Sequence, residues 1–255
     1  MITVTPSNVP YLSCLRKAHE LMVMKRFPGL KETSPALRFG NVLHAVMRHV
    51  YDPNRGTPPH IQYLDTYIRA ALLEQPYEDE ESKRHDAKRA ERLVRLYADD
   101  DEDSEATVSV EQGGTFPILV GGETVYYIRA RPDRILIRPE QNDVVVCRDY
   151  KTSNRCPSPE QIFINLAVCK GLYPGYRAYR LEQDAITDEG VQRTIFTSAE
   201  VRGVVRLLSE KVRRFTCATE FPAEPADGCA YCQAKAGCPA FEAQAGLDSD
   251  DLDQF

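Results

Sequence analysis

The sequence predicts an α/β fold, in which a central mixed sheet is flanked by helices, with a helical part before the sheet and a cysteine-rich segment after it. Three observations predict this. Apolar residues recur at helical spacing over about residues 34–98. Segments rich in Val, Ile, Tyr and Thr, separated by turn residues, fill 107–150 and return at 176–197. Three of the eight cysteines lie close together near the C-terminus, and eight in 255 residues are too few for a disulfide scaffold.

The first helices have clear start and stop signals. Ser34 is a good capping residue, and Pro35 suits the first helical position because its missing N–H would have no partner there. This helix should run to about Tyr51, where Asp52-Pro53 ends it. Two more helices are expected, over 60–74 and 80–98.

The segment that follows is predicted to form a mostly antiparallel sheet. A Thr197-x-x-Glu200 capping box is expected to open a last helix that runs to about Phe215. A helix is also expected at Pro159–Gly171. The expected strands are 107–111, 115–120, 123–131, 133–138, 143–150, 176–187 and 191–197.

The acidic residues are concentrated in three blocks, Glu78–Glu81, Asp99–Glu105 and Asp248–Asp253. Asp99–Glu105, with six acids, is predicted to be an exposed loop. Without the fourteen acids of these blocks, 24 acids remain beside 32 Lys and Arg, although the whole chain has a net charge of −6. A basic body of this kind is compatible with a polyanionic substrate.

We expect one domain over residues 1–241, with a helical part at about 34–98 and a catalytic core at about 107–215, followed by an acidic disordered tail at 242–255. Apolar runs reach only about four residues, far short of a membrane helix, so no membrane partner is expected. The N-terminus has no secretory signal pattern, which predicts a cytoplasmic protein.

Candidate catalytic residues lie at two strand ends. Asp133 stands where one strand turns into the next, and Asp149 and Lys151 end the run VVVCRDYK on the same side of their strand. Two carboxylates can hold a divalent cation that activates water and neutralises phosphate charge, and a lysine can stabilise the developing charge. The pattern therefore suits phosphodiester hydrolysis. The alternative is a solvated Asp–Lys pair at a strand end.

His44 lies on the helix from Ser34, one turn after Gly40. Alone it would be a packed histidine. Together, however, G-x-x-x-H, A-R-P-D-R-I, D-Y-K-T and a following helix with a glutamine resemble the RecB-like branch of the PD-(D/E)XK nuclease superfamily. The restriction-endonuclease-like core of that family agrees with the predicted fold.

The resemblance implies the roles of individual residues. His44, Asp133 and Asp149 match metal ligands, helped by the backbone carbonyl of Tyr150. Asp133, Asp149 and Lys151 match catalytic residues, and Gln161 matches a glutamine that shapes the site. Two positions depart from the family pattern, with Ala130 in place of a glycine and Asn165 in place of a tyrosine.

The resemblance further implies a metal-dependent DNA nuclease, and we expect an exonuclease that prefers single-stranded DNA or DNA ends. Mn²⁺ and Mg²⁺ both remain candidates, and a histidine ligand favours Mn²⁺. The alternative is a binding module for DNA ends or a protein partner, with the same fold and weak catalysis.

The cysteines provide a second candidate site. Cys229, Cys232 and Cys238 form a compact run whose fourth ligand must come from elsewhere, and Cys14 is the natural candidate. This arrangement resembles the AddB-type nuclease domain and the CRISPR-associated family-four exonucleases, in which four thiolates hold a 4Fe-4S cluster. Structural zinc on the same sulfurs is the alternative.

Four biological settings remain possible: recombination, repair, CRISPR adaptation and phage DNA metabolism. A phage-encoded protein would act in the host cytoplasm. There is no G-x-x-x-x-G-K-[ST] phosphate loop, so a helicase would be a separate partner, as would a recombinase, a single-strand-binding protein or an integrase. Two basic stripes are either solvated faces or DNA contacts. They consist of Arg84, Lys88, Arg92 and Arg95, and of Arg202, Arg206, Lys211, Arg213 and Arg214.

Overall fold

The computed structural model describes residues 1–24, 34–120, 122–138, 143–154, 156–224, 229, 232, 238 and 239. The chain divides into two compact units, each made of separate segments. The larger unit contains Thr33–Phe116 and Ile128–Arg202, and the smaller one contains Met1–Glu32, Pro117–Tyr127 and Gly203–Phe255.

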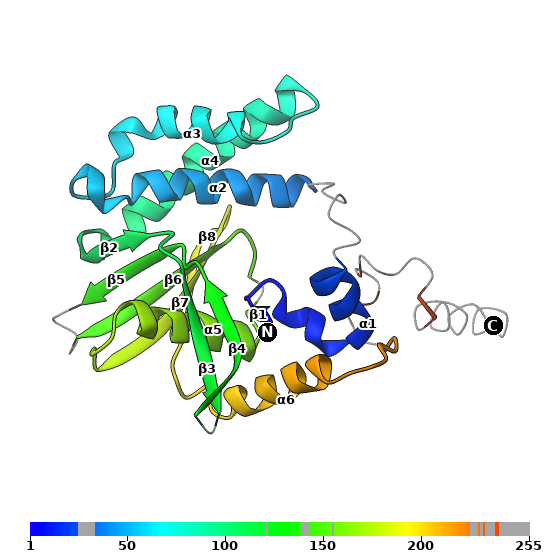
Figure 1. Cartoon of the computed structure of the whole chain (residues 1–255). Helices are drawn as coiled ribbons and strands as arrows, with labels where there is room; N and C mark the ends of the chain where they lie inside the picture. Colours follow the sequence, from blue (N-terminus) through cyan, green and yellow to red (C-terminus); the bar gives the residue numbers. More distant parts are fainter. Residues whose placement is uncertain are drawn as a thin grey trace, which may run out of the picture. The chain divides into compact units, whose positions relative to one another are not determined.

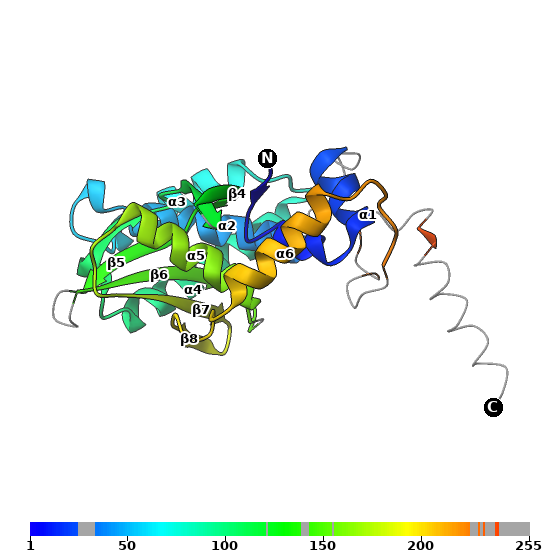
Figure 2. The same ribbon diagram turned by 60° about the horizontal axis from the view of Figure 1, so that its bottom comes forward.

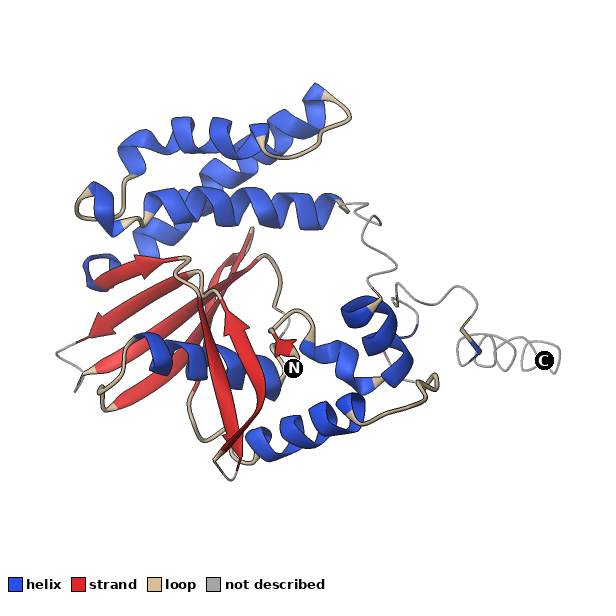
Figure 3. Ribbon diagram, viewed as in Figure 1, coloured by secondary structure: helices blue, strands red, loops and turns tan. Residues whose placement is uncertain are grey.

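A five-stranded mixed sheet forms the centre of the larger unit (Figures 1 and 3). The strand order is β2-β5-β6-β7-β8, in which β6 and β7 are parallel and the other neighbours antiparallel. The parallel pair needs a crossover, and helix α5 (Pro159–Leu172) provides it. The strands are β2 Thr107–Val110, β5 Arg134–Arg138, β6 Val144–Lys151, β7 Ala178–Thr187 and β8 Gly190–Phe196.

Helices cover both faces of this sheet. The α2–α4 side carries α2 (Pro35–Val50), α3 (Leu64–Leu73) and α4 (Glu80–Asp100) (Figure 1). Their apolar faces form one core cluster together with Tyr150 from β6. On the opposite face, α5 packs over the sheet (Figure 2) and buries a second apolar cluster. Short turns of 3-10 helix connect the elements at Pro53–Arg55, Ile61–Tyr63 and Ser104–Ala106.

The remaining elements include a three-stranded sheet, β1-β4-β3, and a set of helices. Its strands are β1 Thr3–Val4, β3 Gly114–Val120 and β4 Glu123–Ala130. Helix α6 (Val204–Thr216) belongs to the smaller unit, as do a 3-10 turn at Val9–Ser13, helix α1 at Leu15–Ala18 and a π-helical turn at His19–Val23.

Most predicted elements are confirmed, including the mixed sheet flanked by helices. The Ser34 hydroxyl caps α2 by accepting a hydrogen bond from the Leu37 N–H at 3.3 Å. The last helix is a correction. Thr197 and Glu200 do hydrogen-bond to each other, but they close a turn, and α6 begins only at Val204. The intervening Gly203 has a left-handed backbone (φ +78°), which helical residues do not adopt.

The acidic block Asp99–Glu105 is the second correction. It was expected to be an exposed loop, but Asp99 and Asp100 complete α4, and the side chain of Asp101 is fully buried. The reason is a set of buried arginines on the sheet beneath it, described below. In the described part of the chain, none of the helices is long and apolar enough to span a membrane. The predicted tail at 242–255 lies outside the described residues, and the domain boundaries stay a prediction.

Candidate active site

Strands β5 and β6 bring the two predicted catalytic aspartates together. In this antiparallel pair Arg134 is in register with Arg148, so Asp133 and Asp149 occupy adjacent positions at the same end of the two strands. Their charges interact, since Asp133 is one of the causes of the pKa shift of Asp149. Two aspartates that are sixteen positions apart in the sequence thereby lie side by side.

Asp133 is held by three hydrogen bonds. Its Oδ1 lies 3.0 Å from Nδ1 of His44 on α2, and its Oδ2 accepts the backbone N–H of Tyr150 at 2.7 Å. Its own carbonyl accepts the N–H of Glu111 at 3.0 Å. The carboxylate orientation is therefore set from α2 on one side and β6 on the other. If Nδ1 of His44 carries the proton, its second nitrogen, Nε2, keeps a free lone pair.

Lys151 pairs with Asp149 on the same side of β6. Its Nζ lies 2.6 Å from Oδ2 of Asp149, and the two side chains are 39% and 23% exposed. Both belong to the face of the sheet that α5 covers, whereas Tyr150 between them is buried among α2 and α4. The Asp149–Lys151 ion pair, which the sequence left as the alternative to a catalytic role, is thus present, and the catalytic role stays a prediction.

The electrostatics of the site show excess negative charge. Burial, then the nearby charge of Asp133, raises the pKa of Asp149, and Lys151 offsets only part of this. Burial tends to lower the pKa of His44, but the charge and hydrogen bond of Asp133 outweigh it, so that this pKa is raised. When His44 is neutral, as it must be to bind a metal, two acids beside one lysine leave a surplus negative charge that a cation would neutralise.

The donor set suits a hard divalent cation, since it offers two carboxylates and an imidazole. In the structure the side chains are paired with each other, His44 with Asp133 and Asp149 with Lys151. Accordingly, no group of three or more His, Cys, Asp or Glu side chains among the described residues converges as a metal site would. The ligand role of each residue, including the Tyr150 carbonyl, stays a prediction.

Gln161 has a structural role at the start of α5. Its side-chain carbonyl accepts the N–H of Ser158 at 2.9 Å, and its own N–H donates to the Ser158 hydroxyl at 3.3 Å. This is a reciprocal capping box. A further part for Gln161 in shaping the site stays a prediction.

Three charged residues beside the site were missed in the sequence. Glu111 accepts from Arg48 at 3.1 Å and from Arg131 at 2.9 Å, next to its backbone contact with Asp133. Arg48 lies one turn after His44 on α2, and this helical spacing could have predicted that Arg48 lies beside the site. No sequence pattern could have predicted the place of Glu111, because its position depends on a left-handed backbone (φ 47°) that is uncommon for glutamate.

The four cysteines of the second candidate site have few described contacts. Cys14 is buried, and its Sγ lies 3.5 Å from the backbone N–H groups of both Lys17 and Glu224. The Cys232 N–H donates to the Cys229 carbonyl at 3.0 Å, and Cys238 is buried. Cys14 is therefore next to the segment that leads to the other three cysteines. Much of that segment lies outside the described residues.

Both basic stripes are partly neutralised by nearby acids. Arg92 pairs with Asp188, and Arg95 lies 3.1 Å from Glu91. In the second stripe Arg206 and Arg214 lie beside Glu210 and Glu224. These pairs reduce the charge that is available to a nucleic acid.

The chain is similar to one family of known proteins and to solved structures. A family model described as the PD-(D/E)XK nuclease superfamily matches residues 10–239. A conjectured exonuclease from Eubacterium rectale has a similar solved structure, with a TM-score of 0.56 at 11% identity, covering 90% of this chain and 88% of that one. The crystal structure of SSO0001 matches with a TM-score of 0.42 at 14% identity, covering 94% and 87%. A search of curated proteins gives no significant match.

Proposed function

The chain belongs to the PD-(D/E)XK nuclease superfamily, and from that membership we propose that it is a metal-dependent deoxyribonuclease that acts on single-stranded DNA or DNA ends. The observation that supports this most directly is the adjacency of Asp133 and Asp149, with His44 and Lys151 each paired to one of them. Nucleases of this superfamily usually use divalent metals, so the surplus negative charge has a natural partner.

In this proposal Asp133, Asp149 and His44 hold Mn²⁺ or Mg²⁺, with the Tyr150 carbonyl as a further ligand. Bound there, the cation would lower the pKa of a water molecule and offset phosphate charge. Lys151 would stabilise the charge that develops on the phosphate. The hydrogen bonds from Tyr150 and Glu111 would keep Asp133 in a fixed orientation, so that little rearrangement is needed.

The preference for ends takes its support from the likeness to the conjectured exonuclease, and the match over 10–239 supports one nuclease domain over 1–241. Arg48 and Arg131 are placed to contact the DNA backbone near the site, since together they carry one more charge than Glu111 neutralises. The settings named from the sequence stay predictions.

The test compares the wild type with Asp149→Asn on end-labelled single-stranded DNA and on closed circles, with Mn²⁺, Mg²⁺ or EDTA. We expect metal-dependent loss of the linear strand, reduced about 10²-fold to 10⁴-fold in the variant. Asp65→Asn, at an exposed position on α3, is the matched control and should cleave normally. DNA binding without cleavage under any metal would instead support the binding-module alternative.

We further propose that Cys14, Cys229, Cys232 and Cys238 hold a 4Fe-4S cluster. The support is the spacing of the last three and the burial of Cys14, whose sulfur two backbone N–H groups approach, as they do around cluster thiolates. Protein purified without oxygen should be brown, and Cys14→Ser should lose the colour. Colourless protein with stoichiometric zinc would show that these cysteines hold a structural zinc ion and not a cluster.

A further inference from the structure

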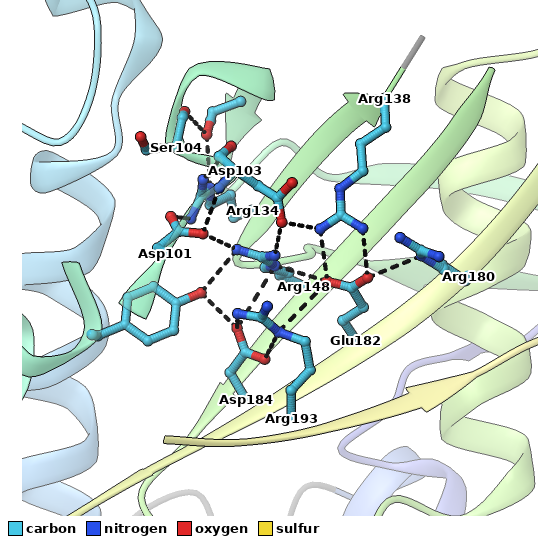
Figure 4. Close-up of polar contacts among 12 residues, drawn as sticks. Asp101, Asp103, Ser104, Arg134, Arg138, Arg148, Arg180, Glu182, Asp184 and Arg193 are labelled. Atoms are coloured by element: carbon cyan, nitrogen blue, oxygen red, sulfur yellow. Dashed lines mark hydrogen bonds and ion pairs between the residues drawn. The ribbon is translucent and has the colours of Figure 1, made fainter. Parts of the chain in front are cut away.

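A buried charged network lies on the α2–α4 side of the five-stranded sheet (Figure 4). At its centre are Arg134 on β5 and Arg148 on β6, which are register partners with fully buried side chains. Two like charges directly opposite on neighbouring strands repel each other, and burial strengthens that repulsion. Without a counter-charge the β5–β6 pair could not close at this position.

Asp101 supplies the counter-charge that both arginines share. Its Oδ2 lies 2.6 Å from Nη1 of Arg134, and its Oδ1 lies 2.6 Å from Nη1 of Arg148. One carboxylate therefore bridges the two strands, each oxygen bound to one guanidinium. The Asp101 side chain is also fully buried, so the bridge is not weakened by water.

The surrounding contacts fix both guanidinium groups. Nε of Arg134 donates to the Thr107 hydroxyl at 2.7 Å, and Nε of Arg148 donates to Glu182 at 3.0 Å. Figure 4 shows Asp101 between the two arginines, while Glu182 lies among Arg138, Arg148 and Arg180. Asp103 also contacts both arginines, through its carbonyl to Arg134 at 3.1 Å and its carboxylate to Arg148 at 2.8 Å. Among the described residues, Asp101 is the one whose carboxylate binds both guanidinium groups.

These two arginines are the immediate neighbours of the candidate catalytic aspartates. Arg134 follows Asp133, and Arg148 precedes Asp149. Since successive residues of a strand point to opposite faces, a bridge on one face fixes the backbone that presents Asp149 on the other. Shifting Arg134 relative to Arg148 would shift Asp133 relative to Asp149 by a comparable amount.

We propose that Asp101 is a positioning residue for the active site: by bridging Arg134 and Arg148 it sets the separation of Asp133 and Asp149, and thereby the affinity of the site for a divalent cation. This inference rests on the proposed nuclease function. The acidic block next to the sheet is then part of the machinery that arranges the metal ligands, although it does not touch the metal or the substrate.

The test is Asp101→Asn, which keeps the shape of the side chain but leaves two buried arginines facing each other. The matched control is Arg138→Met, four residues along β5, which breaks ion pairs of the same network with Glu182 and Asp103 but leaves the Asp101 carboxylate bound to both Arg134 and Arg148. Thermal unfolding, Mn²⁺ binding by calorimetry, and kcat and KM per folded molecule are measured for each.

We expect Asp101→Asn to weaken Mn²⁺ binding about tenfold or more and to lower kcat about 100-fold, with KM for DNA little changed. Arg138→Met should unfold at a lower temperature yet keep both the Mn²⁺ affinity and kcat. If the two variants lose stability but both retain wild-type Mn²⁺ affinity and kcat, Asp101 is only structural and the inference is overturned.

A second variant covers the case in which Asp101→Asn does not fold. Thr107→Val removes the hydroxyl that holds Arg134, and should weaken Mn²⁺ binding in the same direction by a smaller factor; unchanged binding there would overturn the inference. The calorimetry also separates the two proposals. A wild type that binds Mn²⁺ without cleaving DNA would reject the nuclease while leaving the positioning test decisive, and a wild type that does neither would reject both.

Discussion

On the α5 side of the five-stranded sheet, Ile135, Val145 and Leu181 pack with the helix as an ordinary apolar core. On the α2–α4 side of the same strands, Arg134, Arg148 and Glu182 are equally buried but form ion pairs. The apolar face needs only volume and shape, whereas the charged face needs each group to have its partner. The charged face therefore fixes the positions of the strands, whereas the apolar face alone would tolerate a shift of one strand against another.

Two aspartates show the same contrast in their ionisation. The pKa of Asp101 is lowered, because Arg134 and Arg148 outweigh the raising effect of burial. The pKa of Asp149 is raised, by burial and then by Asp133. The charge of Asp101 thus stabilises the fold, while the charge of Asp149 opposes it. Residues of the second kind are typical of sites that bind or react.

The largest expected loss of stability comes from removing a central arginine of the buried charged network. Arg148→Met removes the guanidinium that Asp101, Asp103, Glu182 and Asp184 share, which leaves the network with excess buried negative charge, so the free energy of unfolding should fall by about 3–5 kcal/mol. Urea unfolding measures this. A loss below about 1 kcal/mol, the range of exposed pairs, would show that water reaches the network.

The charged face should also make stability depend on pH. Because the folded-state pKa of Asp101 lies below its unfolded value, its contribution is complete above about pH 4 and is lost as the pH falls through the folded pKa. Between pH 5 and pH 3 the wild type should therefore lose more stability than Asp101→Asn. Equal slopes for the two proteins in urea unfolding would contradict this.

On the apolar face a smaller effect is expected. Ile135→Val removes one buried methylene group between β5 and α5 and should cost about 1 kcal/mol. The loss should be the same at pH 4 and pH 7, since no titrating partner is removed. A pH-dependent loss would mean that the two faces are coupled through the strands.

The smallest expected change has the opposite sign. Asp149→Asn should unfold at a slightly higher temperature than the wild type at pH 7 without metal, because an acid with a raised folded pKa destabilises the fold once the pH exceeds its unfolded value. Differential scanning calorimetry in EDTA tests this. A lower unfolding temperature would mean that the ion pair with Lys151 outweighs burial.

Local signals were enough to predict most of the elements. Ser34-Pro35 marked the start of α2, and the β-rich segments became strands close to the expected bounds. The acidic block was misjudged because its partners, Arg134 and Arg148, lie more than 30 residues away and can be assigned to it only once the sheet is paired. The strand period in RILIR was a usable signal, since it places Arg134 and Arg138 on the same face as the apolar Leu136.

The site was predictable to a similar extent. Asp149 and Lys151 could be placed on one face from strand periodicity alone, whereas the contact of His44 with Asp133 spans 89 residues and was expected only through family resemblance. The bond from the Glu111 N–H to the Asp133 carbonyl depends on the left-handed backbone at Glu111, which no pattern in a single sequence indicates.

The burial of Asp101 has a practical consequence for anyone who engineers this protein. A redesign of surface charge, or a shortened variant made for crystallisation, would regard the stretch DDDEDSE as a solubilising loop that is free to be trimmed or neutralised. Its third residue, Asp101, lies in the interior, paired with arginines of two neighbouring strands. Libraries that vary this stretch should therefore keep position 101 constant and place their diversity at Glu102, which is exposed.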